Sequence, residues 1–515
     1  MIEHSSAYDT RDPSDHVGDY LDTQTKPQLL SLPSHCPLSA DCGKISDDIN
    51  GINLTSTWNR HYLHCSALRA TALAHYGKEL TKSKRNLDSM STQRKDDLKL
   101  WRSMSMGVQR IGRYWNRTSL DIWKEVNGSF FHTLSASHRA LVEGVAQAKK
   151  VDRHCDGCAV VAPQILCFLE SFWAGNFMRS NLNTENQRTG IDASTILSSI
   201  HTYDPQTGCT NSTFQPCSSR ALANYKTVTD SFRNMYSINS GIAKGHGFAV
   251  GRYPEDSDHG GNPWYVTTLA AAEQLYLARL QWQDQEQLTI DETSLPFFRD
   301  LLPRISIGTY RSRPNSATFK SVLSAVQDYA DGYMAMVKKY TPSDGDLSEQ
   351  FSRDNGAPIS TSDSAWSNMA FQTAVDRRNG IRGDSWGEPE NNVVEISQCY
   401  CHATVTFNLR SRYTALDYAW IVGDVPELGN GNVHLGRGLD AESPYMKLPF
   451  NTKYTNHAMQ IDVPASTFIK YHYFLIDKLV YDPNPRGESV HHYVHTGECG
   501  SNTIVHDGYG NSGPM

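Results

Sequence analysis

Long apolar runs, an excess of basic charge and a hydrophobic leader are all lacking in this chain of 515 residues. No stretch of eighteen apolar residues occurs, so we expect no transmembrane helix. The formal net charge of -7 offers no basic field to a polyanion, which argues against a nucleic-acid partner. Residues 1–20 are acidic and polar, and they have neither the basic nor the apolar region of a signal peptide.

The composition is that of a globular protein. Hydrophobic residues make up 39% and charged residues 20% of the chain, and its length suggests two to four domains of roughly 150 residues each. The chain also has 10 Trp and 25 Tyr. Sugar rings stack on such aromatic faces, although core packing is their more common use. The aromatic content is therefore only a hint of a carbohydrate ligand.

The cysteines indicate an oxidising environment. Close pairs occur among the 11 cysteines at Cys155/Cys158 and Cys209/Cys217. Glycosylation sequons begin at Asn53, Asn116, Asn127 and Asn211. Together these features favour disulfides and a secretory route. A redox or zinc pair is the alternative for Cys155/Cys158, but no second metal-ligand pair follows at zinc spacing. An incomplete gene model would reconcile this evidence with the polar start.

The period of the apolar residues is helical from residue 67 to residue 381. In one example, Asn262 is the expected N-cap and Pro263 the first helical residue of a stretch that continues to Leu280. Helical stretches are predicted near 67–80, 98–115, 130–150, 162–182, 193–203, 219–238, 262–280, 295–305, 322–337 and 362–380. About ten helices with almost no strand pattern predict an all-α domain of bundle or toroid type.

The period changes to that of strands at Cys399. The alternating segments are ATVTFNL, YAWIVG, AMQIDV, FIKYHYFLI and SVHHYVH, and turn residues separate them. Several short strands in about 100 residues predict an antiparallel sandwich. The predicted organisation is an irregular segment at 1–57, a helical domain at 58–388, a linker at 389–400, a sandwich at 401–503 and a tail at 504–515.

Six segments of the helical region occur in a recognisable order. They are SALRATALAHYG, RYWNRTSLDIWKEVNGSFFHTLSASHRALVEG, APQILCFLESFW, IHTYDPQTGCTNSTFQPCSSRALANYK, AVGRYPEDSDHGGNPWYVTTLAAAEQLY and DLSEQFSRDNGAP. Together they resemble the fungal glucoamylases of glycoside hydrolase family 15. The segments VTFNL, WIVGDVPELGN and YDPNP resemble, more loosely, a family 20 starch-binding module.

The resemblance implies a fold and a function. The fold would be an (α/α)6 toroid of inner and outer helices, incomplete here, followed by a small antiparallel β-sandwich. The implied function is a glucan 1,4-α-glucosidase that removes glucose from the non-reducing ends of starch and maltooligosaccharides with inversion. We expect a monomer that needs no metal or other cofactor and acts on α-1,4-glucans without a membrane or nucleic-acid partner.

The resemblance also implies the catalytic residues. Glu349 matches the general base, Asp121 the residue sometimes assigned the role of acceptor, and Lys124 occupies the position of the general acid. Inverting hydrolysis needs two carboxyl groups roughly 6.5 to 9.5 Å apart. An ammonium with a reference pKa of about 10.4 is a poor proton donor for this step. We expect a helix here, and because adjacent helix residues point about 100° apart, Glu125 is not expected to replace Lys124.

Further residues are assigned by the same resemblance. The substrate-binding residues are Trp58, Arg60, Trp123, Glu125, Arg252, Tyr253 and Trp366. Tyr413, Tyr445 and Phe450 would bind starch on the sandwich, although edge packing is an equally good interpretation. The implied disulfides are Cys167–Cys399, Cys209–Cys217 and Cys401–Cys499.

Two departures leave two interpretations open. Lys124 lacks a carboxyl group, and residues 1–57 contain no counterpart of the family's early helices or of the segment that grips the terminal glucose. The chain is therefore either an enzyme of this family with impaired catalysis or a catalytically inactive descendant. Such a descendant would be a weak α-glucan-binding protein or a gene remnant.

Overall fold

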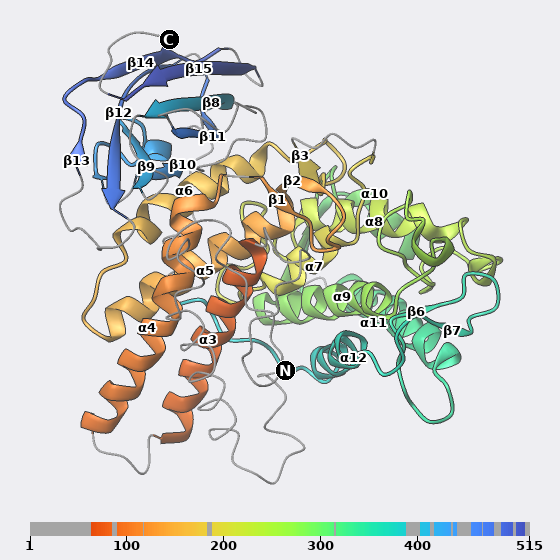
Figure 1. The fold of residues 1–515 in the computed structure, drawn as a ribbon. Helices are drawn as coiled ribbons and strands as arrows, with labels where there is room; N and C mark the ends of the chain where they lie inside the picture. Colours follow the sequence, from red (N-terminus) through yellow and green to blue (C-terminus); the bar gives the residue numbers. More distant parts are fainter. Residues whose placement is uncertain are drawn as a thin grey trace. The chain divides into compact units, whose positions relative to one another are not determined.

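The computed structural model describes most of the chain from Leu63 onward (Figure 1). The described residues are 63–84, 90–116, 118–182, 188–313, 316–387, 402–411, 417–433, 436–439, 455–465, 467–477, 486–497 and 501–509. They form two compact units. The first contains residues 130–136 and 169–387, and the second contains residues up to 129, residues 137–168 and residues from 402 onward.

Helices dominate the first unit. They are α7 (Ser194–His201), α8 (Ser219–Arg233), α9 (Tyr265–Gln285), α10 (Leu295–Leu301), α11 (Ser316–Tyr340) and α12 (Ala365–Arg378). Nearly every residue of α9 is buried, and this helix packs against α7, α11 and α12. A helix that is buried all round lies inside a domain, so α9 forms the centre of this unit.

Local signals explain where two of these helices begin. The side chain of Ser218 accepts a hydrogen bond from the amide of Ala221 at the start of α8, and Ser364 caps α12 in the same way. The predicted start of α9 is wrong. Helix α9 begins at Tyr265, because Pro263 accepts a hydrogen bond from the amide of Phe351 and is held in extended pairing instead.

Short hairpins connect the helices of this unit. Strand β4 (Gln287–Ile290) pairs with β5 (Gly308–Arg311), and β6 (Gln350–Phe351) pairs with β7 (Pro358–Ile359), both antiparallel. The sequence pattern did not predict these strands, since two to four residues are too few to establish an alternating period.

Among its described residues, the second unit contains four α-helical segments and a hairpin. The helices are α3 (Leu63–Lys84), α4 (Met90–Tyr114), α5 (Phe131–Lys150, in this unit from Ser137) and α6 (Asp156–Glu170). Strands β1 (Ser119–Leu120) and β2 (Asn127–Phe130) pair antiparallel. Helices α3 and α4 pack together through small residues. Gly107 allows this approach, because a β-carbon there would lie 3.3 Å from the carbonyl oxygen of Ser66.

The ten predicted helices all occur within the described ranges. A second boundary is also wrong, because α6 ends at Glu170 rather than near residue 182. The residues after it form turns, in which the amide of Phe172 donates to the carbonyl of Leu169 and the amide of Trp173 to that of Glu170. No helix in the described part of the chain has the length and apolarity required to cross a membrane.

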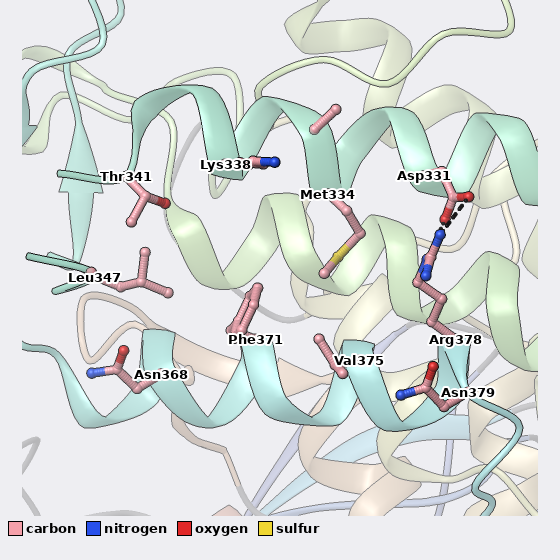
Figure 2. A pocket seen from close by; sticks show the side chains of 12 residues that line it. Asp331, Met334, Lys338, Thr341, Leu347, Asn368, Phe371, Val375, Arg378 and Asn379 are labelled. Atoms are coloured by element: carbon pink, nitrogen blue, oxygen red, sulfur yellow. Dashed lines mark hydrogen bonds and ion pairs between the residues drawn. The ribbon is translucent and has the colours of Figure 1, made fainter. Parts of the chain in front are cut away.

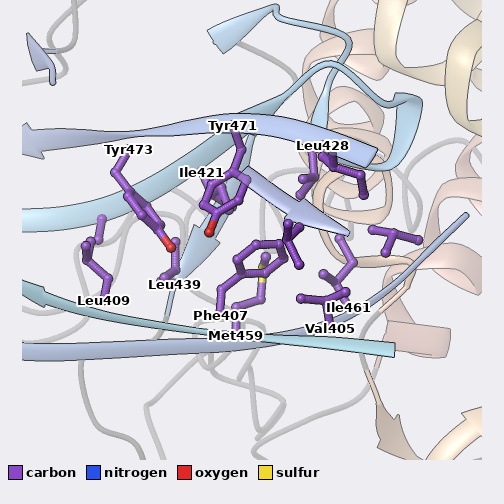
Figure 3. Close-up of a cluster of buried hydrophobic side chains, with 14 of the residues drawn as sticks. Val405, Phe407, Leu409, Ile421, Leu428, Leu439, Met459, Ile461, Tyr471 and Tyr473 are labelled. Carbon is purple, nitrogen blue, oxygen red and sulfur yellow. The ribbon is translucent and has the colours of Figure 1, made fainter. Parts of the chain in front are cut away.

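The C-terminal residues of the second unit form a β-sandwich. Its strands are β8 (His402–Ser411), β9 (Asp417–Gly423), β10 (Arg437–Leu439), β11 (Thr455–Pro464), β12 (Phe468–Asp477), β13 (Arg486–Gly487), β14 (His492–His495) and β15 (Asn502–Gly508). One sheet has the order β10-β9-β12-β13, with β14 also paired to β12, and the other has the order β11-β8-β15. Figure 3 shows the core between them, including Phe407, Ile421, Met459 and Tyr471.

One pairing departs from the predicted antiparallel pattern. Strand β15 runs parallel to β8, with Asn502 opposite Thr404 and Gly508 opposite Arg410. Strand β8 already pairs with β11 on its other side. The last strand therefore completes this sheet at its free edge and continues into the segment predicted as a tail.

Candidate active site

Arg252 is fixed in the loop that precedes α9. Its side chain is only 4% exposed, and its Nε and Nη2 atoms donate to the two carboxylate oxygens of Asp256 at 2.8 and 2.7 Å. The guanidinium also lies over the ring of Trp264, 4.8 Å from its centroid. A bidentate ion pair between a planar guanidinium and a carboxylate has a defined geometry, so this loop holds Arg252 in one orientation.

Tyr253 lies between two cations. The guanidinium of Arg252 is 5.3 Å from the ring centroid, and that of Arg188 is 3.8 Å from it. Arg188 also donates to the Tyr253 hydroxyl at 2.9 Å. Sequence reasoning missed Arg188, because no local pattern relates residues 65 positions apart. Glu255, Asp256 and Asp258 all follow Arg252 within six positions, so the sequence alone does not single out Asp256 as its partner.

Glu349 is half-buried and directly precedes β6. Its Oε2 accepts a hydrogen bond from the hydroxyl of Ser360 at 2.6 Å. Its backbone is held on both sides, since its amide donates to the carbonyl of Thr361 and its carbonyl accepts from the amide of Tyr265. The carboxylate therefore has a fixed position beside the first residue of α9.

The segment of Glu349 is joined to the loop of Arg252. Gln350 forms an isolated β-bridge with Trp264, and its Nε2 donates to Asp258 at 3.0 Å. The other end of this connection is Asp258, which lies 3.8 Å from Arg252 Nη2. The structure thus brings together two predicted site residues that are almost one hundred positions apart in the sequence.

Trp366 belongs to the same neighbourhood. It is 39% exposed in the first turn of α12. The start of this helix is tied to the residues just before Glu349, because the amide of Ser364 donates to the carbonyl of Leu347 and the hydroxyl of Ser367 donates to the carbonyl of Ser348. The predicted site residues of the first unit therefore all lie on segments connected by hydrogen bonds.

The segment around Lys124 is a turn, so the expectation that it is helical was wrong. Residues 121–126 connect β1 to β2, and Lys124 has a φ of 65°. Asp121 is 2% exposed, and its Oδ1 accepts hydrogen bonds from the amides of Glu125 and Val126 at 2.7 and 3.3 Å. Its carboxylate is thus engaged in holding the turn. The argument that Glu125 points about 100° from Lys124 no longer applies.

Trp123, Lys124 and Glu125 differ in exposure within this turn. The Trp123 ring is buried, whereas Lys124 and Glu125 are exposed. The charge of Lys124 affects a buried neighbour, His64. Burial and, to a smaller extent, the Lys124 ammonium lower the pKa of His64 to about 4. His64 is therefore neutral near pH 7.

A cavity of about 660 Å³ lies between α11 and α12. Figure 2 shows its apolar floor, with Met334, Phe371 and Val375 directed toward one another. At one end Arg378 pairs with Asp331 at 2.8 Å. Burial raises the pKa of Asp331, but hydrogen bonds from Arg378 and Tyr276 outweigh it and hold this pKa below its usual value. Neither Glu349 nor Arg252 lines this cavity, so it is separate from the predicted site.

Several predicted residues lie outside the described part of the chain. They are Trp58, Arg60, Tyr413, Tyr445, Phe450, Cys399, Cys401 and Cys499.

Both of the close cysteine pairs named from the sequence are disulfides. Cys209 is bonded to Cys217 as predicted, with a Cα–Cα distance of 5.0 Å, and Cys155 is bonded to Cys158. Cys167 is also disulfide-bonded. Within the described ranges, no three side chains of His, Cys, Asp or Glu are grouped so that they could hold a metal ion.

Comparison with known proteins identifies the family. The profile of glycosyl hydrolases family 15 matches residues 48–376, which is more than half of the chain. The chain belongs to glycosyl hydrolase family 15. The family region includes the turn at 121–126, the Arg252 loop, Glu349 and Trp366.

The most similar relatives of this family 15 chain include several fungal proteins. It is 38% identical to glucoamylase-1 of Arthroderma benhamiae over 499 residues, which is 90% of this chain and 78% of that protein. It is 44% identical to a glucoamylase of Neurospora crassa over 398 residues, or 75% of this chain and 61% of that protein. The chain thus spans less than two thirds of the Neurospora protein.

Solved structures of family 15 also resemble this chain. The Hormoconis resinae glucoamylase is 35% identical with a TM-score of 0.70, and the match covers 98% of this chain and 88% of that one. The family 15 glucoamylase of Hypocrea jecorina is 32% identical with a TM-score of 0.68, covering 99% and 89%. The predicted fold class, an (α/α)6 helical domain followed by a small sandwich, is confirmed.

Proposed function

We propose that this family 15 chain is a glucan 1,4-α-glucosidase, which releases glucose from chain ends of starch and maltooligosaccharides with inversion. Glucoamylases that are 38% and 44% identical to it support the substrate class. The arrangement that carries the proposal is the attachment of the Glu349 segment to the Arg252 loop through Gln350 and Asp258. A carboxylate and a sugar-binding arginine on adjoining segments suit attack on a terminal glucose.

Each residue of the first unit has a defined part in the proposal. Glu349 takes a proton from the attacking water, and the Ser360 hydroxyl, which donates to its Oε2, fixes the carboxylate for this transfer. Arg252 and Tyr253 hold the sugar, since Asp256 and Arg188 keep both side chains in place. Trp366 provides an aromatic wall. Groups that are already held in the required orientation need little reorganisation during the reaction.

The second unit contributes the residues of the turn and the early substrate-binding residues. Trp123 and Glu125 bind substrate in this proposal, together with Trp58 and Arg60. Asp121 holds the turn through the amides of Glu125 and Val126, which is a structural task rather than proton transfer. We propose that Lys124 occupies the general-acid position in this turn.

Lys124 limits the chemistry at the general-acid position. Its ammonium keeps its proton at a pH where an acid with a pKa near 6 would donate it to the leaving oxygen. It also opposes the positive charge that develops on the sugar. At about 4 Å and an effective dielectric near 20, this repulsion amounts to roughly 4 kcal/mol. Loss of acid catalysis removes a further factor of ~10² to 10⁴ in rate.

A catalytically inactive α-glucan-binding descendant or a gene remnant is the second candidate. Lys124 favours it, and so does the predicted lack of a counterpart of the early family helices in residues 1–57. The retained Glu349, with its Ser360 partner, favours the enzyme. The two candidates differ in whether any turnover depends on Glu349.

The remaining parts of the proposal concern the C-terminal region and secretion. We propose that residues 401–503 form a starch-binding module that uses Tyr413, Tyr445 and Phe450. In this proposal Cys167–Cys399 ties the helical domain to the C-terminal region, and Cys401–Cys499 closes the sandwich. The disulfide between Cys209 and Cys217 supports passage through an oxidising compartment, and therefore secretion.

Hydrolysis of α-glucosyl fluoride tests the proposed function. Fluoride leaves without full protonation, so this substrate bypasses the defect at Lys124 and reports on Glu349. We expect the unmodified chain to release β-glucose, detected by proton NMR of the anomers. The change Glu349→Gln should lower the rate by ~10² or more, whereas Glu292→Gln at an exposed position should not. Release of α-glucose, or equal rates in the unmodified chain and Glu349→Gln, would contradict the proposal.

A further inference from the structure

The outer face of the sandwich carries two exposed aromatic rings in contact. Phe468 on β12 is 62% exposed and Tyr493 on β14 is 54% exposed. Their ring centroids are 5.4 Å apart, and their planes differ by only 23°. Single exposed apolar side chains are normal, but a contiguous aromatic pair facing water marks an interaction surface.

The strand register places two polar side chains beside these rings. In the pairing of β12 with β14, Phe468 lies opposite His495 and Lys470 lies opposite Tyr493. Paired residues of an antiparallel ladder share a face, and all four of these side chains are exposed. We refer to Phe468, Lys470, Tyr493 and His495 as the aromatic patch.

The rest of the two strands gives the patch a rigid base. The alternate residues Ile469, Tyr471 and Val494 point to the other face and belong to the sandwich core. Because the patch stands on a sheet whose opposite face is buried, its rings keep their relative positions when a ligand arrives. Little conformational entropy is then lost on binding.

The chemistry of the aromatic patch fits a polyhydroxylated chain. Nearly parallel rings offer apolar faces on which the C–H faces of pyranose rings can stack. The Lys470 ammonium, the His495 imidazole and the Tyr493 hydroxyl lie at the margin, where they can hydrogen-bond to sugar hydroxyls. An extended ligand suits a surface of this kind better than a small molecule, which needs an enclosing pocket.

A second copy of the chain fits the patch less well. A two-fold contact through the patch would bring the Lys470 ammonium groups of both copies into one interface. Juxtaposed like charges oppose such an association. A neutral polysaccharide meets no such repulsion.

We propose that the aromatic patch binds an α-glucan chain, as a site separate from Tyr413, Tyr445 and Phe450. The identity of the sugar rests on the proposed function. The patch retains protein on the polymer and takes no part in bond cleavage.

Adsorption of the full chain to granular starch tests the proposal. The double change Phe468→Ala and Tyr493→Ala should weaken adsorption about tenfold or more, since two stacking faces are lost. The ring-preserving pair Phe468→Tyr and Tyr493→Phe should adsorb nearly as the unmodified chain does. Ile504→Ala provides the matched control, because Ile504 is 59% exposed on β15 of the other sheet. All variants should unfold at the same temperature.

The outcomes distinguish this proposal from the proposed function. The double variant should hydrolyse α-glucosyl fluoride as the unmodified chain does, and adsorption that depends on the rings supports the patch even if no turnover is found. The proposal is overturned if the unmodified chain does not adsorb, if the double variant adsorbs equally well, or if Ile504→Ala loses as much. A dimer in sedimentation that the double variant dissociates would also overturn it, because the patch would then join two copies.

Discussion

At the scale of single residues, Asp121 shows how one carboxylate maintains the turn that carries Lys124. It is buried, and it accepts hydrogen bonds from the amides of Glu125 and Val126. We expect Asp121→Ala to lower the free energy of unfolding by about 1–3 kcal/mol, because two amides lose their acceptor. Asp121→Asn keeps an acceptor oxygen and should cost much less. Urea unfolding measures both, and equal losses would argue against this structural role.

Arg252 and Asp256 form a buried ion pair, and breaking this pair should lower the free energy of unfolding considerably. Both side chains are almost completely buried, at 4% and 3% exposure. Removing the Asp256 charge takes the bidentate partner from a buried guanidinium, and Asp258, 3.8 Å away, does not replace it at hydrogen-bond distance. We therefore expect Asp256→Asn to lower the free energy of unfolding by about 3–5 kcal/mol. The exposed change Glu292→Gln is the reference and should stay within about 0.5 kcal/mol. A loss no larger than the reference would mean that Asp256 does not hold Arg252.

At the scale of elements, His492 connects three strands of the sandwich. It lies on β14, and its Nδ1 is 3.2 Å from Asp507 on β15. Its Nε2 is 3.1 Å from Glu488, which directly follows β13. The hydroxyls of Tyr471 and Tyr473 on β12 donate to Asp507 at 2.7 and 2.8 Å. Burial lowers the pKa of His492, but the two carboxylates outweigh it and raise this pKa to about 9.

This arrangement predicts a dependence of stability on pH. A raised folded-state pKa stabilises the sandwich fully below the unfolded pKa of about 6.5, and the contribution disappears as the pH rises through about 9. After screening by water, the loss between pH 6 and 10 should be roughly 2 kcal/mol. The chain with His492→Gln should lack this loss, whereas His506→Gln on the exposed side of β15 should retain it. Urea unfolding across this range measures the effect, and identical profiles for all three chains would contradict it.

Elements with a long apolar period could be predicted from the sequence, and short or tertiary features could not. Helix α11 and strand β12 follow directly from their spacing. The turn at 121–126 could not be predicted, because its conformation depends on the Asp121 carboxylate as a hydrogen-bond acceptor, which an apolar period does not reveal. The parallel pairing of β15 with β8 depends on which sheet edge is free. The Arg188 contact with Tyr253 depends on the fold as a whole.

At the scale of the whole molecule, the candidate site in the first unit combines the segments of Arg252 and Glu349, which are almost one hundred positions apart in the sequence. The family resemblance alone suggested the roles of Glu349, Arg252 and Lys124, because no local pattern joins them. The structure adds the partners that fix the first two, namely Ser360 and Asp256. That Lys124 stands at the general-acid position remains the central prediction.

Glucose release from maltose by the unmodified chain and by Lys124→Glu tests this prediction most directly. We expect the unmodified chain to work at least ~10³ times more slowly than the variant, because the change restores a proton donor and removes a cation from the site. The exposed change Lys320→Glu controls for the altered net charge. Substantial recovery in Lys124→Glu alone is the predicted result. If the unmodified chain already hydrolyses maltose as fast as this variant, Lys124 does not occupy the general-acid position, and Glu125 becomes the first residue to test.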